Sequence, residues 1–165
     1  MVKTLLIMRH GKSDWETSVG RDHERLLNER GRKAATRMGR HLVERGVDPD
    51  LVVSSSAVRT RETTERLLAC WGGTPRVIFD RALYLTDTDG VIEYLSRTAG
   101  DAQVVLLVNH EPTCSLLVHC LCRENVDHFP TAALARVDLA IDDWQDLRRN
   151  VGTLAWMTVP RELSG

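Results

Sequence analysis

"VKTLLIMRHG", residues 2–11, begins with a short apolar run and ends in a cation, an imidazole and a glycine. A nearly continuous apolar run of this length predicts a β-strand covered on both faces, as the strands of parallel sheets are. Packing alone does not explain why a buried strand ends in Arg9, His10 and Gly11. The stretch therefore predicts a strand of an α/β sheet with a functional group at its carboxyl end.

Segments of strand and helix character alternate along the chain that follows. We expect strands at 50–54, 76–79 and 102–109, and helices at 28–46, 57–71, 89–98 and 112–121, with Pro112 at the first helical position. Two further strands, at 133–141 and 153–159, follow one another directly and predict an antiparallel pair. The alternation predicts an α/β fold: one three-layer α/β/α domain over residues 1–165, with a mostly parallel central sheet and an antiparallel C-terminal strand pair.

Composition argues against several classes of protein. A chain of 165 residues with 42% apolar content can form one domain with a proper core, and a net charge of −1 gives no sign of binding to nucleic acid or a membrane. The longest apolar runs are too short to cross a bilayer, and the first residues lack the pattern of a signal peptide. Four cysteines do not suggest a disulfide framework at this length, so we expect a cytoplasmic protein with free thiols.

Charged and imidazole side chains follow three of the predicted strands. Arg9 and His10 follow the first, Arg59 and Arg61 come after the second, and His110 comes after a later one. Ligands of open α/β sheets bind beyond the carboxyl ends of strands, so these side chains should converge on one rim. Arginine forks fit phosphate oxygens, and a neutral imidazole is a competent nucleophile, more so with arginines nearby that disfavour its protonation. The rim therefore predicts phosphoryl transfer, in which one histidine attacks and the other donates hydrogen bonds to the transferring oxygens.

At these residues the sequence resembles the histidine phosphatase superfamily, which is named for its RHG motif. Four blocks, "LLIMRHGKSDW", "RLLNERGRKAA", "SSSAVRTRETTE" and "VNHEP", occur in the order of its small phosphohistidine phosphatase, or SixA-type, branch, and cover the chain to about Pro112. The resemblance implies a phosphatase in which His10 is the phosphorylated nucleophile and Arg9, Arg59 and His110 form the phosphate pocket. We expect no metal or other cofactor, because the arginines supply the positive charge that magnesium supplies in other phosphoryl-transfer sites. The partner that the resemblance implies is a phosphorylated protein, for instance a histidine phosphotransfer domain in a signalling relay.

The general acid is left open by the sequence. Mutase-like members of the superfamily carry a glutamate after the third strand, where the nearest match here is Tyr84. Asp14, Asp22, Asp87 and Glu111 are further candidates. The imidazole that leaves from phosphohistidine is far less basic than the alkoxide of a sugar phosphate, so a phosphohistidine substrate can manage with a weak acid or none.

Two other functions stay open. A broad phosphatase or mutase for small phosphate esters would use the same residues, although strands that are closely followed by helices predict an open pocket, which suits a protein substrate better. The alternative of a different class is a phosphate-binding module without turnover, because no acid is assigned.

Several other patterns have structural interpretations. "CWGGTPR", 70–76, has the Cys-x5-Arg spacing of cysteine phosphatases, but a helix precedes it and a strand follows, which reverses the context of such a site. The cysteines 114, 120 and 122 are interpreted as packing residues rather than zinc ligands. The basic helix segment "RGRKAATRMGR" is interpreted as a solvated face, and His23 and His41 as surface residues.

Overall fold

The computed structural model describes residues 2–14 and 21–163 of the 165-residue chain. In these ranges the strands are β1 Lys3–Arg9, β2 Leu51–Ser55, β3 Arg76–Asp80, β4 Val104–Asn109, β5 Leu134–Leu139 and β6 Gly152–Thr158. They form one sheet in the order β3-β2-β4-β1-β5-β6. The first four strands run parallel, whereas β5 pairs antiparallel with both β1 and β6. The predicted α/β fold, with its mostly parallel sheet and antiparallel C-terminal pair, is confirmed.

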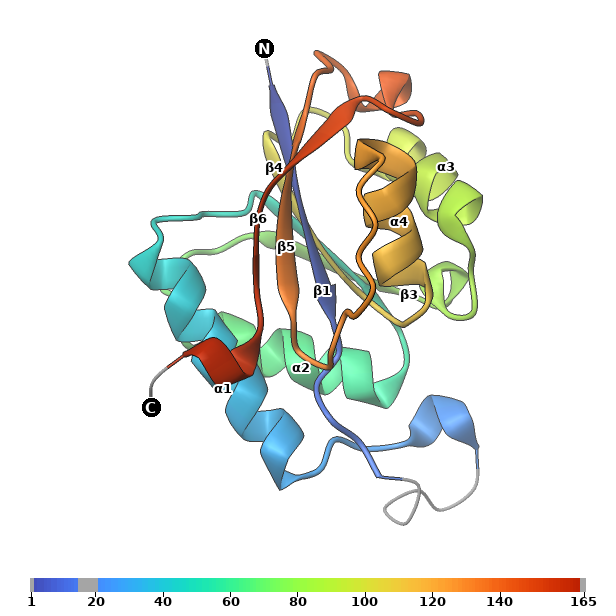
Figure 1. Ribbon diagram of the computed structural model, residues 1–165. Helices are drawn as coiled ribbons and strands as arrows, with labels where there is room; N and C mark the ends of the chain where they lie inside the picture. Colours follow the sequence, from blue (N-terminus) through green and yellow to red (C-terminus); the bar gives the residue numbers. More distant parts are fainter. Residues whose placement is uncertain (1, 15–20, 164–165) are drawn as a thin grey trace.

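Helices cover both faces of this sheet and make the predicted three layers (Figure 1). They are α1 Glu29–Glu44, α2 Val58–Ala69, α3 Thr88–Thr98 and α4 Thr113–Cys122. Side-chain caps fix two of their starts, since Asn28 accepts a hydrogen bond from the Gly31 amide of α1 and Asp87 accepts one from the Gly90 amide of α3.

The start of α4 differs from the prediction by one residue. Pro112 is the N-cap, not the first helical residue: its carbonyl accepts a hydrogen bond from the Leu116 amide, but its own ψ angle is 3°. A residue that already accepts the first helical hydrogen bond but lacks helical dihedral angles is by definition a cap.

No helix in the described residues is long and apolar enough to cross a membrane.

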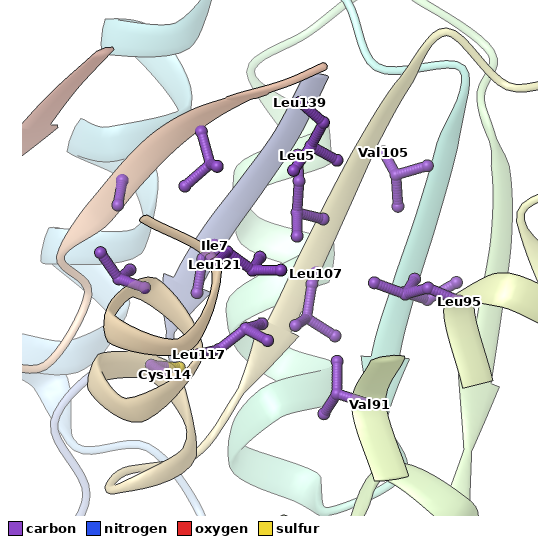
Figure 2. Close-up of a cluster of buried hydrophobic side chains, with 14 of the residues drawn as sticks. Leu5, Ile7, Val91, Leu95, Val105, Leu107, Cys114, Leu117, Leu121 and Leu139 are labelled. Carbon is purple, nitrogen blue, oxygen red and sulfur yellow. The ribbon is translucent and has the colours of Figure 1, made fainter. Parts of the chain in front are cut away.

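The apolar run of β1 is continuous because helices lie on both sides of it. Alternate strand residues point to opposite faces, so Leu5 and Ile7 pack toward α3 and α4, whereas Leu6 and Met8 pack toward α1 and α2. Figure 2 shows the first of these clusters, in which Ile7 lies beside Leu117 and Leu121 of α4, and Leu107 of β4 lies near Val91 of α3. The labelled side chains are all fully buried, and they pack against β1 and β4, which pair side by side.

A close contact between two glycines fixes the chain where it leaves β1. A Cβ atom added to Gly11 would lie 2.7 Å from the Gly31 carbonyl oxygen, and one added to Gly31 would collide with the Lys12 backbone. The Gly11 amide also donates a 2.9 Å hydrogen bond to Thr63 Oγ1 of α2. The backbone that carries His10 is thereby held against both α1 and α2.

Candidate active site

The carboxyl ends of β1, β2 and β4 meet at one edge of the sheet, at the lower end in Figure 1. His10 follows β1 and His110 follows β4, and these strands are neighbours in which Arg9 lies opposite Asn109. The two imidazole rings consequently lie 5.3 Å apart, centroid to centroid. A cavity of about 210 Å³ opens here, and its lining residues are Arg9, His10, Lys12, Ser13, Arg25, Arg59, His110, Glu111 and Thr131. The structure thus brings together the four residues predicted for the phosphate site.

His10 is oriented through its backbone neighbour. Its Nδ1 lies 2.7 Å from the Gly11 carbonyl oxygen, which can only accept, so Nδ1 carries the proton and Nε2 keeps a free lone pair. Burial lowers the pKa of His10 to about 3. The hydrogen bond to Gly11 opposes this shift, and the charges of His110, Arg59 and Arg9 add to it. The sequence predicts a neutral His10 on the basis of the arginines; the larger cause is the loss of water, since the side chain is only 6% exposed.

His110 is held by the end of a third strand. Its Nε2 lies 2.9 Å from the hydroxyl oxygen of Ser55, the last residue of β2. Burial lowers the pKa of His110 to about 3 as well; the Arg59 charge adds to the shift and the Asp22 charge opposes it. Its buried Nδ1 has no hydrogen-bond partner among the described residues.

Arg9 is half-buried and Arg59 is buried, and hydrogen bonds fix the guanidinium group of each. Arg9 donates from Nη1 to the Phe129 carbonyl at 3.0 Å, and Arg59 donates to the Asp22 carbonyl at 2.8 Å and to Asp22 Oδ2 at 3.0 Å. In each guanidinium the buried Nε has no partner within the part of the chain that is described. Buried donors normally have acceptors, so both arginines retain capacity for the oxygens of a bound oxyanion.

Arg61 lies outside this site. It is exposed, and its guanidinium stacks over the Phe79 ring at 4.1 Å from the centroid. Arg59 and Arg61 therefore have different surroundings, although only one residue separates them in α2.

Two of the acid candidates lie beside the phosphate residues and bind each other. The Tyr84 hydroxyl donates a 2.6 Å hydrogen bond to Asp22 Oδ2, the same oxygen that Arg59 contacts. Burial acts to raise the pKa of Asp22, but the Tyr84 hydrogen bond and the Arg59 charge outweigh it, so the pKa lies below its ordinary value. Burial and the bond to Asp22 raise the pKa of Tyr84. At neutral pH the pair is a carboxylate and a phenol whose proton is already donated.

The other candidates have different partners. Asp87 is exposed and caps α3, and Asp14 is exposed and is not among the residues that line the cavity. Glu111 does line it, but its two carboxylate oxygens accept hydrogen bonds from the Ser115 amide at 2.7 Å and the Ser115 hydroxyl at 2.8 Å. The structure thus does not bring Asp14 and Asp87 to the cavity, and it uses Glu111 to hold the first turn of α4.

The prediction that every strand is closely followed by its helix is wrong for β1. Residues 10–28 separate β1 from α1, and within them the short 3-10 helix η2, Asp22–Glu24, lies against Arg59. This connection supplies Arg25 to the lining of the cavity. His23, predicted at the surface, is half-buried: its Nε2 lies 2.8 Å from Ser56 Oγ, and its ring packs edge-on against Tyr84. Burial lowers its pKa.

A sequence signal for these missed residues existed. "RDHER", 21–25, is a compact group of charged and imidazole side chains directly before an apolar pair. "SSS" at the end of the second strand was the corresponding signal for Ser55. His41 is also half-buried rather than at the surface, beside Trp156 and Thr158, and it does not line the cavity.

The cysteines have the surroundings of packing residues. Cys114 is fully buried, and burial raises the pKa of its thiol. Within residues 2–14 and 21–163, no three His, Cys, Asp or Glu side chains are grouped so as to hold a metal ion. Cys70 follows α2 and precedes β3, which confirms the reversed context that separates "CWGGTPR" from a cysteine phosphatase loop.

Comparison with known proteins identifies the family. The family model of the histidine phosphatase superfamily (branch 1) matches residues 5–84. An uncharacterized protein of Mycobacterium leprae is 30% identical over 166 residues, which cover 93% of this chain and 100% of the relative. The structure of SixA from Nakamurella multipartitia is 29% identical, with a TM-score of 0.83 and 97% of both chains covered. The structure of the protein histidine phosphatase SixA complexed with tungstate is 26% identical, with a TM-score of 0.82, over 96% of this chain and 98% of that one. The chain belongs to the histidine phosphatase superfamily, in its SixA-type branch, and membership indicates a phosphatase.

Proposed function

We propose that this phosphatase removes the phosphoryl group from phosphohistidine on a protein, by way of a covalent phosphohistidine at His10. The observation that carries the proposal is the protonation of the site: a neutral His10 with a free Nε2 lies beside the cations Arg9 and Arg59, and Asp22, the carboxylate that contacts Arg59, is ionised. The site is therefore equipped to attack and to stabilise negative charge, but it offers no ready proton to a leaving group.

In the first step, the Nε2 lone pair of His10 attacks phosphorus and the bond from phosphorus to the substrate's imidazole nitrogen breaks. The electron pair of that bond stays on the substrate ring, whose other nitrogen carries a proton taken from water, so the ring leaves as neutral imidazole. Arg9 and Arg59 stabilise the charge on the transferring oxygens. If the Ser55 hydroxyl donates to Nε2 of His110, the His110 proton is on Nδ1, and that ring can donate to the same group.

In the second step, water attacks the phosphorus of phosphorylated His10. The bond from phosphorus to Nε2 breaks and inorganic phosphate leaves, which restores the neutral imidazole. Both steps put negative charge on the same oxygens, so the same arginines act twice. The match to SixA complexed with tungstate supports a site of this kind, because tungstate is a tetrahedral oxyanion like phosphate.

The substrate is inferred from its leaving group. An alkoxide from a sugar phosphate needs a proton at the moment of departure, whereas the imidazole of phosphohistidine does not. The Tyr84 proton is already donated to Asp22, and Glu111 is occupied by Ser115. A pocket with these groups favours the phosphoramidate over the ester.

Rapid quench with a phosphorus-labelled substrate tests the intermediate. Wild-type protein should yield an adduct on His10 that is labile in acid and stable in base, and H10A should yield none. A fully active H10A variant would refute the proposed nucleophile.

A substrate panel tests the specificity. We expect kcat/KM for a phosphorylated histidine phosphotransfer domain to exceed kcat/KM for sugar phosphates and for a phosphoserine peptide. A sugar phosphate that is better by about tenfold, or about 1.4 kcal/mol in transition-state binding, would instead assign a small-ester phosphatase. No turnover of any member, including an activated aryl phosphate, would assign a phosphate-binding module.

A further inference from the structure

A second cavity adjoins the active site and is strongly cationic. It has a volume of about 330 Å³, and it shares Lys12 and Thr131 with the catalytic cavity. We call it the basic hollow and define it by its charged lining residues, Lys12, Arg30, Lys33, Arg37 and Arg161. No carboxylate of the described residues lines it. The C-terminal 3-10 helix η5, Pro160–Glu162, lies beside α1 (Figure 1), and residues of both elements line the hollow.

Few carboxylates among the described residues neutralise the cations of the basic hollow. Lys33 lies 4.0 Å from Glu29, and both side chains are exposed. The described residues contain no ion pair for Arg30, Arg37 or Arg161, and the buried Nε of Arg37 has no hydrogen-bond partner there. By contrast, Arg32 on a neighbouring face of α1 pairs with Glu62 at 3.3 Å. The chain has a net charge of −1, so this excess of positive charge belongs to one face rather than to the whole molecule.

The positive charge extends along α1 beyond the hollow. Arg30, Lys33, Arg37 and Arg40 are three or four residues apart and therefore share one helical face. Ten residues of helix span about 15 Å, which is longer than one sugar phosphate. A partner that contacts this whole stripe is larger than a metabolite.

From this placement we propose that the basic hollow and its α1 stripe bind acidic side chains of the phosphorylated protein whose phosphoryl group enters the catalytic cavity. This inference rests on the proposed function. Continuity through Lys12 and Thr131 means that one substrate can occupy both cavities at once. A protein is favoured over a nucleic acid, because no aromatic side chain among the described residues lines the hollow to stack on bases. The basic segment that the sequence suggests is a solvated helix face is thus assigned a role in substrate selection.

A pair of phosphohistidine peptides tests this assignment with the full chain. The two peptides are identical except that four residues around the phosphohistidine are glutamate in one and glutamine in the other. Exposed ion pairs are individually weak, so a few of them should together give the wild type about a tenfold preference in kcat/KM for the glutamate peptide at low salt. About 0.5 M salt should remove most of this preference.

The variant R30Q/K33Q/R37Q should lose the preference while it hydrolyses the glutamine peptide at the wild-type rate. Glutamine keeps helix propensity, and a thermal melt checks the fold. The matched control is R97Q/R148Q/R149Q, which removes the same charge from the other end of the sheet, where α3 ends and where β5 connects to β6 (Figure 1). This control should keep the preference.

Three results would overturn the assignment: no preference in the wild type, a preference that survives in R30Q/K33Q/R37Q, or an equal loss in the control. An oligonucleotide that binds the wild type but not the variant, without any glutamate preference, would also overturn it. A second peptide pair, in which phosphotyrosine replaces phosphohistidine, tests the basic hollow independently of the proposed function. If only the phosphotyrosine peptides are hydrolysed, the proposed substrate is wrong, and the glutamate preference within that pair still decides whether the basic hollow binds acidic residues.

Discussion

Lowering the pH from about 7.5 to about 5 should destabilise the folded protein through His10, by an amount that follows from its burial. An ordinary histidine has a pKa near 6.5, whereas that of His10 is lowered to about 3. Between these two values the unfolded chain binds a proton at this position and the folded chain does not. The free energy of unfolding therefore falls as the pH drops below about 6.5, and it stops falling only below the folded pKa.

The loss of unfolding free energy at pH 5 is set by the pKa of His10 in the unfolded chain, because pH 5 still lies above its pKa in the folded chain. A pH of about 5 lies about 1.5 units below the unfolded pKa, and each unit corresponds to about 1.4 kcal/mol, so His10 should cost about 2 kcal/mol of stability. The pKa values of His110, His23 and His41 are also lowered, chiefly by burial, so the wild type should show a steeper total dependence than one site gives.

Urea unfolding at a series of pH values, on the wild type and on H10Q, isolates the contribution of one histidine. The loss of stability between pH 7.5 and 5 should be smaller in H10Q by about 2 kcal/mol, whatever the stability of H10Q at pH 7.5. The matched control is H128Q, which replaces an exposed histidine outside the cavity and should keep the wild-type pH dependence. Equal pH dependence in H10Q and the wild type would refute the argument that His10 is held neutral by burial.

Three further results are expected. R59A should lower kcat by about 10² to 10³-fold, because Arg59 is a buried charge that the proposed mechanism places at the transferring group. The kcat of R61A should stay within about threefold of the wild type. Equal losses of kcat in steady-state assays would contradict the placement of Arg61 outside the site. Activity should survive exhaustive chelation, because arginines supply the positive charge that a metal supplies elsewhere, and a loss that zinc or magnesium restores would argue against this. G31A should lower the free energy of unfolding by about 1–3 kcal/mol, because its Cβ would collide with the Lys12 backbone, whereas G72A, with open space around the new Cβ, should melt like the wild type.

The predictable part of the molecule is the part with regular apolar patterns. The run at Leu5 to Met8 and the run at Val104 to Val108 each predict a strand buried on both faces, and both are strands with helices on each side. Parallel strands put their carboxyl ends on one edge, which is why Arg9, His10, Arg59 and His110 could be expected at one rim without knowledge of the strand order. That β1 and β4 are immediate neighbours, which sets the 5.3 Å distance between the imidazole rings, depends on packing that no local pattern encodes.

The connection between β1 and α1 illustrates what local patterns leave out. Its η2 segment has no apolar periodicity, so its charged sequence indicates a functional group but does not predict where in the fold that group lies. Its position depends on Arg59, which donates to both the Asp22 carbonyl and the Asp22 carboxylate from the first turn of α2. A contact between residues 37 positions apart holds η2 against α2, and Arg25, which directly follows η2, lines the cavity.

The same contact decides what Asp22 can do. A carboxylate candidate near a phosphate pocket suggests a general acid, but the proton it would need is disfavoured by Arg59 and by the Tyr84 hydrogen bond, which together keep its pKa low. An ionised Asp22 instead holds the Arg59 guanidinium in place. Its negative charge reduces the net positive charge of the site by one unit. Within the described residues, the cavity is lined by four permanent cations, and these face the carboxylates of Asp22 and Glu111, while both histidines are neutral. An excess of about two positive charges remains, which matches a phosphoryl dianion. We therefore propose that Asp22 acts through Arg59 as a positioning residue and that the remaining positive charge favours binding of the phosphoryl group.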